Sequence, residues 1–125
     1  MRTRVLLSIK PEFSRLIFSG EKKFEYRRVI FRDERVSTVV VYSSSPVQRV
    51  VGEFRVGEIL RGAPEDLWLR TGRVSGIAQS AFFRYFENCD TGYAIEVRNP
   101  KQYRLRQTLD CAFAIASPPQ SFCYL

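Results

Sequence analysis

Four charged residues stand close together after a glycine near the start of the chain and could form a binding or catalytic cluster. Lys22 comes two residues after Gly20, and Glu25, Arg27 and Arg28 follow. On a strand, Glu25 and Arg27 would share one face, because side chains two residues apart point the same way. The cluster would then offer a cation, a carboxylate acceptor and a forked donor that can grip a phosphate or a base edge. On a strand that faces only solvent, the same residues would form ion pairs of little energetic value.

Two further segments have polar groups that suit recognition of an anion. Ser43 to Ser45 precede Pro46, and hydroxyl and backbone N–H groups in a tight loop can bind an anion, although an ordinary polar turn has the same composition. Residues 98–106 (RNPKQYRLR) hold four basic residues, no acid and Tyr103. This run suits phosphates together with a stacked base, and equally an edge strand protected by its charge.

The overall composition favours a polyanionic partner and argues against several kinds of site. Lys and Arg number 20 against 13 Asp and Glu, a net charge of +7, which attracts polyanions and also helps to keep a small protein in solution. The chain has no histidine, which argues against a Ser-His-Asp triad and a histidine-containing zinc site. Its three cysteines form no C-x-x-C pair, so we expect neither a zinc knuckle nor a disulfide framework. No metal and no cofactor are expected.

Length and hydropathy predict a single domain, residues 1–125, in the cytoplasm. The 125 residues fit one hydrophobic core. The apolar run from Val5 to Leu7 is too short for a signal peptide, and no stretch approaches the roughly 20 apolar residues of a membrane span. We therefore expect a soluble intracellular protein that has reduced thiols and no membrane partner.

The hydrophobic pattern predicts three helices among short strands. Pro11 at the first turn, an apolar face of Phe13, Leu16 and Ile17, and Gly20 at the end define a helix over 11–19. Shorter helices are expected from 64 to before 72 and over 79–87. Strands are expected over 5–9, 24–30, 37–43, 49–60, 92–97, 102–105 and 122–125, with an interruption at Pro100.

This order has few crossovers and favours a mixed or antiparallel sheet that curls into a barrel, an α+β fold that is mainly β. The helix over 11–19 should pack across one end of a closed or nearly closed barrel. Because the helix ends at Gly20, it delivers Lys22 to the mouth of the next strand.

The run SIKPEFSRLIFSGEKKFEYRR resembles the start of ASCH domains, whose hallmark is G-x-K-x-x-x-x-R, often with a glutamate two residues before the arginine. The segments VVVYSSSPVQRVVGEF, SGIAQSAFFRYF, GYAI and PPQSF follow the same plan, so the resemblance covers essentially the whole chain. It implies a small PUA-like β-barrel with an RNA-binding cleft between barrel and helices.

The leading hypothesis is a non-catalytic domain that binds RNA or a nucleotide in this cleft. The residues expected to bind are Lys10, Lys22, Glu25, Arg27, Arg28, Ser43, Ser44, Ser45 and Gln120. The rival is a hydrolase for RNA or N(4)-acetylcytidine, with Lys22 and Glu25 as catalytic residues. One branch of the family hydrolyses N(4)-acetylcytidine with a Lys, a Thr and a Glu. Lys22 matches that lysine, and Glu25 stands at the threonine position.

A protein-interaction domain is the third hypothesis, and it would show as an exposed apolar patch. Whether the chain is an enzyme stays open, because a binding domain and a hydrolase need the same charged cleft. Its oligomeric state stays open as well.

Overall fold

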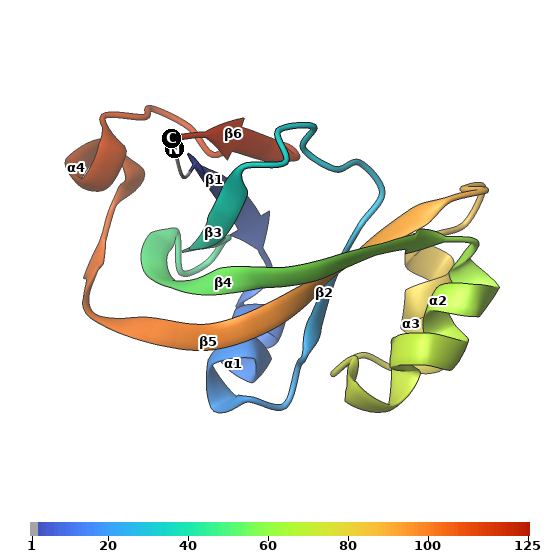
Figure 1. The fold of residues 1–125 in the computed structure, drawn as a ribbon. Coiled ribbons are helices and arrows are strands. Elements are labelled where there is room, and N and C mark those ends of the chain that lie inside the picture. Colours follow the sequence, from blue (N-terminus) through green and yellow to red (C-terminus); the bar gives the residue numbers. More distant parts are fainter. Residues whose placement is uncertain (1–2) are drawn as a thin grey trace.

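Six strands form one curled sheet in the computed structural model, which describes residues 3–125 (Figure 1). The strands are β1 (Thr3–Ile9), β2 (Phe24–Arg27), β3 (Val36–Ser43), β4 (Arg49–Gly62), β5 (Gly92–Gln107) and β6 (Phe122–Tyr124). Their order across the sheet is β2-β5-β4-β3-β1-β6. β1 and β3 pair in parallel, and the other neighbours pair antiparallel. The predicted α+β, mainly β, curled architecture is confirmed.

The helices are α1 (Pro11–Ser19), α2 (Pro64–Thr71), α3 (Gln79–Tyr85) and α4 (Leu109–Phe113), with a 3₁₀ turn, η1 (Gly72–Val74), after α2. α1 has the predicted bounds. Pro11 fits its first turn, where a missing N–H leaves no bond unmade, and Gly20 ends it at φ 87°. Ile17 is the fully buried member of its apolar face and reaches the main core. Within residues 3–125, no helix is long and apolar enough to cross a membrane.

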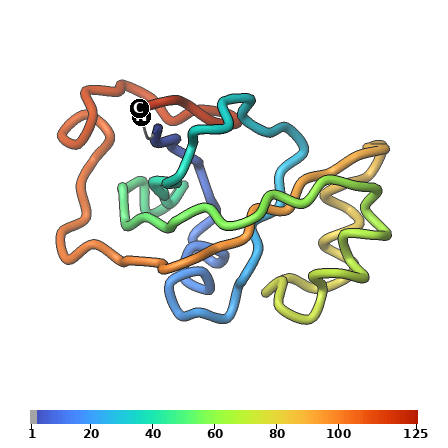
Figure 2. The backbone as a smooth tube through the Cα atoms, in the orientation of Figure 1, coloured from blue at the N-terminus to red at the C-terminus, as the bar shows by residue number. Residues whose placement is uncertain are grey.

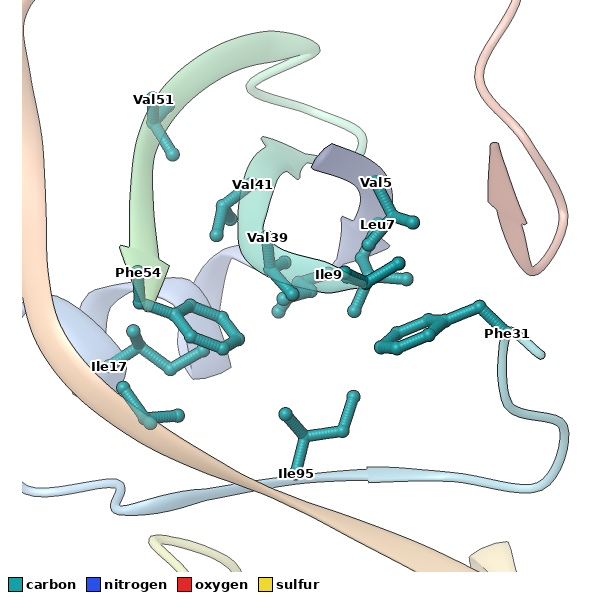
Figure 3. Close-up of a cluster of buried hydrophobic side chains, with 12 residues drawn as sticks. Val5, Leu7, Ile9, Ile17, Phe31, Val39, Val41, Val51, Phe54 and Ile95 are labelled. Atoms are coloured by element: carbon teal, nitrogen blue, oxygen red, sulfur yellow. The ribbon is translucent and has the colours of Figure 1, made fainter. Parts of the chain in front are cut away.

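Both faces of the central strands are buried. Val5, Leu7 and Ile9 of β1 point into the curl of the sheet with Val39 and Val41 of β3, and Figure 3 shows them facing Phe54, Ile17 and Ile95. The alternate residues Leu6, Val40 and Tyr42 pack on the other face against Leu109 of α4. Burial on both faces explains the continuous apolar run that predicts β3.

β4 and β5 run side by side as a long ribbon that carries α2 and α3 at one end (Figure 2). There Leu67, Phe82 and Phe86 form a third cluster with Ala94 of β5 and Tyr26 of β2. This packing holds α3 beside β2, which begins shortly after Lys22.

Three element predictions need correction. Pro100 does not interrupt β5, because Arg55 pairs with Arg98 and Glu53 with Lys101. Two residues of β5, Asn99 and Pro100, therefore lie opposite one residue of β4. This β-bulge takes Pro100 out of the hydrogen-bond ladder, and Asn99 adopts φ 49°. β2 ends at Arg27 rather than at residue 30, and α4 was not expected.

Hydrogen bonds between strands do not close the barrel. Among the described residues, β2 and β6 are the two edges of the sheet, so the backbone forms a half-barrel. These edge strands are short, with four and three residues.

Candidate functional site

A cleft of about 390 Å³ lies between α1, β2, α3 and the segment before β6. Polar and charged side chains share its surface with aromatic rings. Its lining consists of Ser8, Ile9, Lys10, Phe13, Lys22, Glu25, Tyr26, Arg27, Arg28, Ile77, Ala81, Arg84, Tyr85 and Gln120. The structure thus brings together six of the residues predicted from sequence: Lys10, Lys22, Glu25, Arg27, Arg28 and Gln120.

Lys22 borders the cleft although its side chain is only 2% exposed. Its ammonium donates a 2.7 Å hydrogen bond to the backbone carbonyl of Ser75. Nζ also lies 5.1 Å from the ring centre of Phe13 and 4.9 Å from that of Tyr26, within range of cation–π attraction. Burial lowers the pKa of Lys22, and the charge of Glu25 partly opposes this. The cleft therefore has a fixed, largely dehydrated cation in its wall.

Two turns fix the position of Lys22. The Lys22 backbone N–H bonds to the carbonyl of Leu16 at 3.0 Å, and the next N–H, of Lys23, bonds to Val74 at 2.8 Å. Gly76 adopts φ +67°, and a Cβ there would lie 2.9 Å from Cβ of Lys22. The absence of a side chain at Gly76 therefore leaves room for the lysine stem.

Glu25 and Arg27 lie side by side, as their spacing on a strand predicts. The Glu25 side chain is 8% exposed and that of Arg27 12%, and Oε2 of Glu25 accepts a 3.3 Å hydrogen bond from Nη1 of Arg27. Arg27 also donates to the backbone carbonyls of Ser8 at 3.3 Å and Ser121 at 2.8 Å. The protein itself thus supplies three acceptors to this guanidinium.

α3 contributes a wall that sequence reasoning missed. Arg84 and Tyr85 line the cleft together with Ala81, and the guanidinium carbon of Arg28 lies 4.8 Å from the ring centre of Tyr85. Burial raises the pKa of the Tyr85 phenol. The spacing of Ala81, Arg84 and Tyr85 at i, i+3 and i+4 shows that they share a helix face, but not what that face adjoins.

Tyr26 also lines the cleft and is tied into the wall by its hydroxyl. Its OH lies 2.6 Å from Oγ1 of Thr71, which in turn donates to the carbonyl of Leu67 at 2.7 Å. Because the Thr71 proton is used in that bond, the Tyr26 hydroxyl is the donor to Thr71. Burial raises the pKa of Tyr26, so its phenol is neutral near pH 7.

The Ser43 to Ser45 loop does not reach this cleft. Ser43 is 2% exposed, and its hydroxyl lies 3.1 Å from that of Ser14. Ser43 pairs with Ile9, the last residue of β1, and it borders a second hollow of about 540 Å³ that shares no lining residue with the first. Ser44 donates its backbone N–H to Ile9 and accepts from Val47. Ser43 and Ser44 therefore help to hold the turn together.

The basic run of β5 is partly used in internal contacts. Arg98 forms a 2.9 Å ion pair with Glu96, and the Tyr103 hydroxyl donates to Oε1 of Glu53 at 2.7 Å. The half-buried Tyr103 ring packs against the second core cluster. The exposed basic residues of the run are Arg98, Lys101, Arg104 and Arg106.

Residues 3–125 contain no group of three or more His, Cys, Asp or Glu side chains that could hold a metal ion. The thiols of Cys89, Cys111 and Cys123 are free.

The half-barrel and its cleft define a small PUA-like domain. The N-terminal domain of McrB from Staphylothermus marinus has a similar fold, with a TM-score of 0.55 at 11% identity over 91% of this chain and 81% of that chain. No protein-family model matches the sequence.

Comparison of sequences gives a narrower result. The ASCH domain-containing ribonuclease of Zymomonas mobilis is 31% identical over 127 residues, which cover 99% of this chain and 85% of that protein. The crystal structure of ASCH from this organism superposes with a TM-score of 0.91 at 30% identity, covering 100% of this chain and 89% of that chain. The chain belongs to the ASCH domain family.

The large ribosomal subunit protein uL22 of Ureaplasma parvum is 27% identical over 125 residues. This match covers 97% of the present chain but only 39% of uL22. The sequence of this chain therefore also matches part of a much longer protein.

Proposed function

We propose that this chain binds single-stranded RNA in the cleft between α1, β2, α3 and the segment before β6. The observation that carries the proposal is the dehydrated ammonium of Lys22, held between the rings of Phe13 and Tyr26 in the wall of an open cleft. A cation in a poorly hydrated site attracts a phosphate or a carbonyl more strongly than one in water. Aromatic rings next to cations suit a base joined to a phosphate.

The surroundings of Lys22 extend the same pattern. Arg28 and Arg84 lie at the α3 side and Lys10 at the α1 side, where they can contact phosphates. Tyr85, stacked with Arg28, offers a surface for a base. A cleft of about 390 Å³ admits an unpaired nucleotide more readily than a duplex, whose bases are stacked inside the helix. Gln120 then supplies an uncharged partner, and Glu25 an acidic one, for base or sugar groups.

We take residues 1–125 as one domain in this proposal, because β6 near the end of the chain pairs with β1 near its start. The three free thiols fit a reducing cytoplasmic location.

A second candidate is cleavage of the bound RNA, because the Zymomonas mobilis relative, similar over 99% of this chain, is named a ribonuclease. In transesterification, the 2′-oxygen attacks phosphorus and the bond to the 5′-oxygen breaks. One group takes the 2′-hydroxyl proton, and another protonates the leaving oxygen. With no histidine in the chain, Glu25 and Lys22 are the candidates for these two roles. Burial lowers the pKa of Lys22, which makes proton transfer at its amine easier.

Incubation with labelled single-stranded RNA of mixed sequence tests both candidates, with N(4)-acetylcytidine in parallel. Fluorescence anisotropy reports binding, and separation of the products reports turnover. Bound RNA that stays intact supports a binding domain, and new RNA ends support a ribonuclease. Release of acetate would instead establish an amidohydrolase. Failure to bind RNA at low salt, with no turnover of either substrate, would overturn the proposal and favour a protein partner.

A further inference from the structure

The segment before β6 is held on both sides of Gln120. Ser8 Oγ donates a 3.0 Å hydrogen bond to the carbonyl of Pro119, and Arg27 Nη2 donates a 2.8 Å hydrogen bond to the carbonyl of Ser121. Gln120 lies between these two acceptors, is exposed, and lines the cleft. Its neighbours are thus fixed while its own side chain is free to meet a ligand.

Arg27 joins the two edges of the sheet. It is the last residue of β2, one edge strand, and Ser121 immediately precedes β6, the other edge strand. Arg27 also donates from Nη1 to the carbonyl of Ser8, next to the end of β1. The contact between Phe31 and Phe122, with ring centres 6.0 Å apart, adds an apolar link between the same two regions. Side chains therefore span the gap that backbone hydrogen bonds leave open.

We propose that Arg27 is a positioning residue that holds Pro119 to Ser121 against the cleft, and that Gln120, presented by this segment, selects the base of the bound RNA. The selection of a base by Gln120 rests on the proposed function, whereas the positioning role of Arg27 does not.

The contacts of Arg27 favour this role over direct binding of a phosphate. Its side chain is 12% exposed, and three protein acceptors from Glu25, Ser8 and Ser121 already surround it. A phosphate would have to compete with the carboxylate of Glu25 and two carbonyls. Arg28, by contrast, is exposed and stacks on Tyr85, so its N–H groups remain open to solvent.

The carboxamide of Gln120 suits a base better than a phosphate. It combines a donor and an acceptor in one plane and can form two hydrogen bonds with the edge of a base. It has no charge, so it adds little to the attraction of the RNA backbone. Loss of Gln120 should therefore change which base is preferred, whereas loss of a cation should weaken binding to all sequences about equally.

Hydrogen exchange in the absence of RNA tests the positioning role. Arg27→Lys keeps the charge but loses the planar fork that reaches several acceptors, and Ser8→Ala removes only the bond to Pro119. We expect amides of the segment before β6 and of β6 itself to exchange about tenfold faster in Arg27→Lys, as for loss of one charge-assisted hydrogen bond. Ser8→Ala should give a smaller increase, and the matched control Arg28→Lys none. Unchanged exchange in both Arg27→Lys and Ser8→Ala would overturn the positioning role, whatever the protein binds.

A double-mutant cycle with RNA tests the link to Gln120. Affinities for oligoribonucleotides of A, C and U are compared for Arg27→Lys, Gln120→Ala and the double variant. If Arg27 acts through Gln120, the double variant binds about as weakly as Gln120→Ala, and both single variants lose the same base preference. If the fold-losses of affinity in the two single variants multiply in the double variant, Arg27 does not act through Gln120. If Gln120→Ala keeps the wild-type base preference, Gln120 does not select the base. Arg28→Lys should weaken binding to all three oligonucleotides alike.

Discussion

The ammonium of Lys22 donates a 2.7 Å hydrogen bond to the backbone carbonyl of Ser75, 53 residues further along the chain. Lys22 follows α1, and Ser75 follows η1, so this bond ties together two turns that belong to different parts of the fold. The place of the cation in the cleft depends on both turns. The next residue, Gly76, is the one that packs on the lysine stem.

Gly76→Ala should displace Lys22 and weaken RNA binding. Its φ of +67° is strained for alanine, and its Cβ would lie 2.9 Å from Cβ of Lys22 and 3.2 Å from Cγ. The strained backbone alone costs about 1–2 kcal/mol of unfolding free energy, and crowding adds to it. Denaturant unfolding and RNA titration measure the two effects separately.

Gly20→Ala is the matched control for this substitution. Gly20 has φ +87°, but a Cβ there would meet only Nζ of Lys23, at 3.9 Å. Gly20→Ala should therefore lower the unfolding free energy through its strained backbone, while its RNA affinity stays near that of the wild type. Equal losses of affinity in the two variants would show that Gly76 has no special relation to Lys22.

The buried amine of Lys22 should make stability depend on pH. Burial lowers its pKa in the folded state from 10.5, so the unfolded chain binds more protons between the lowered value and 10.5. The unfolding free energy therefore rises with pH across this window, by at most about 1.4 kcal/mol per pH unit. Below the window Lys22 is charged in both states, and the folded protein bears the full cost of desolvation.

Urea unfolding of the wild type and Lys22→Met at a series of pH values isolates this contribution. The difference between them should grow in favour of the wild type as pH rises. The buried phenols of Tyr26 and Tyr85 have raised pKa values and act in the opposite direction above about pH 10, but both variants contain them. A difference that does not vary with pH would mean that Lys22 has the same pKa in both states.

The exposed basic residues of β5 should contribute to affinity through counterion release. Arg104→Gln and Arg106→Gln should each flatten the log–log dependence of RNA affinity on salt by about 0.7 unit if that side chain contacts a phosphate of a single strand. Arg35→Gln is the control, because it removes the same charge from an exposed guanidinium that is bonded to Asp33 at 2.8 and 3.0 Å. A slope unchanged in Arg104→Gln and Arg106→Gln would show that this surface serves only solubility.

The sequence predicts those structural features that depend on residues close together in the chain. The α1 bounds follow from Pro11 and Gly20, the buried β3 strand from its apolar run, and the shared face of Glu25 and Arg27 from the period of two. The family motif by itself points to Lys22. Each of these features lies within a stretch of about ten residues.

Features that depend on distant segments could not be predicted in this way. The partner of Lys22 is a carbonyl, which every residue has, so no side-chain pattern could point to Ser75. The bulge at Pro100 depends on the register of β5 against β4. The position of Ser43 depends on its pairing with Ile9, which lies 34 residues earlier in the chain. The hydrogen bond from the Tyr103 hydroxyl to Glu53 joins two neighbouring strands, so the run containing Tyr103 could not reveal it.

The measurement that tests the central claim most directly is an RNA titration of Lys22→Met beside Lys23→Met, at one salt concentration and with product analysis. The two variants lose the same charge from adjacent positions, but Lys22 is buried in the cleft wall and Lys23 is exposed outside it. Lys22→Met should weaken binding by about 1–3 kcal/mol, or abolish turnover if the bound RNA is cleaved, with the fold intact. Lys23→Met should change affinity by less than about 0.5 kcal/mol. Equal effects of the two variants, or wild-type binding and turnover in Lys22→Met, would contradict the assignment of this cleft as the RNA site.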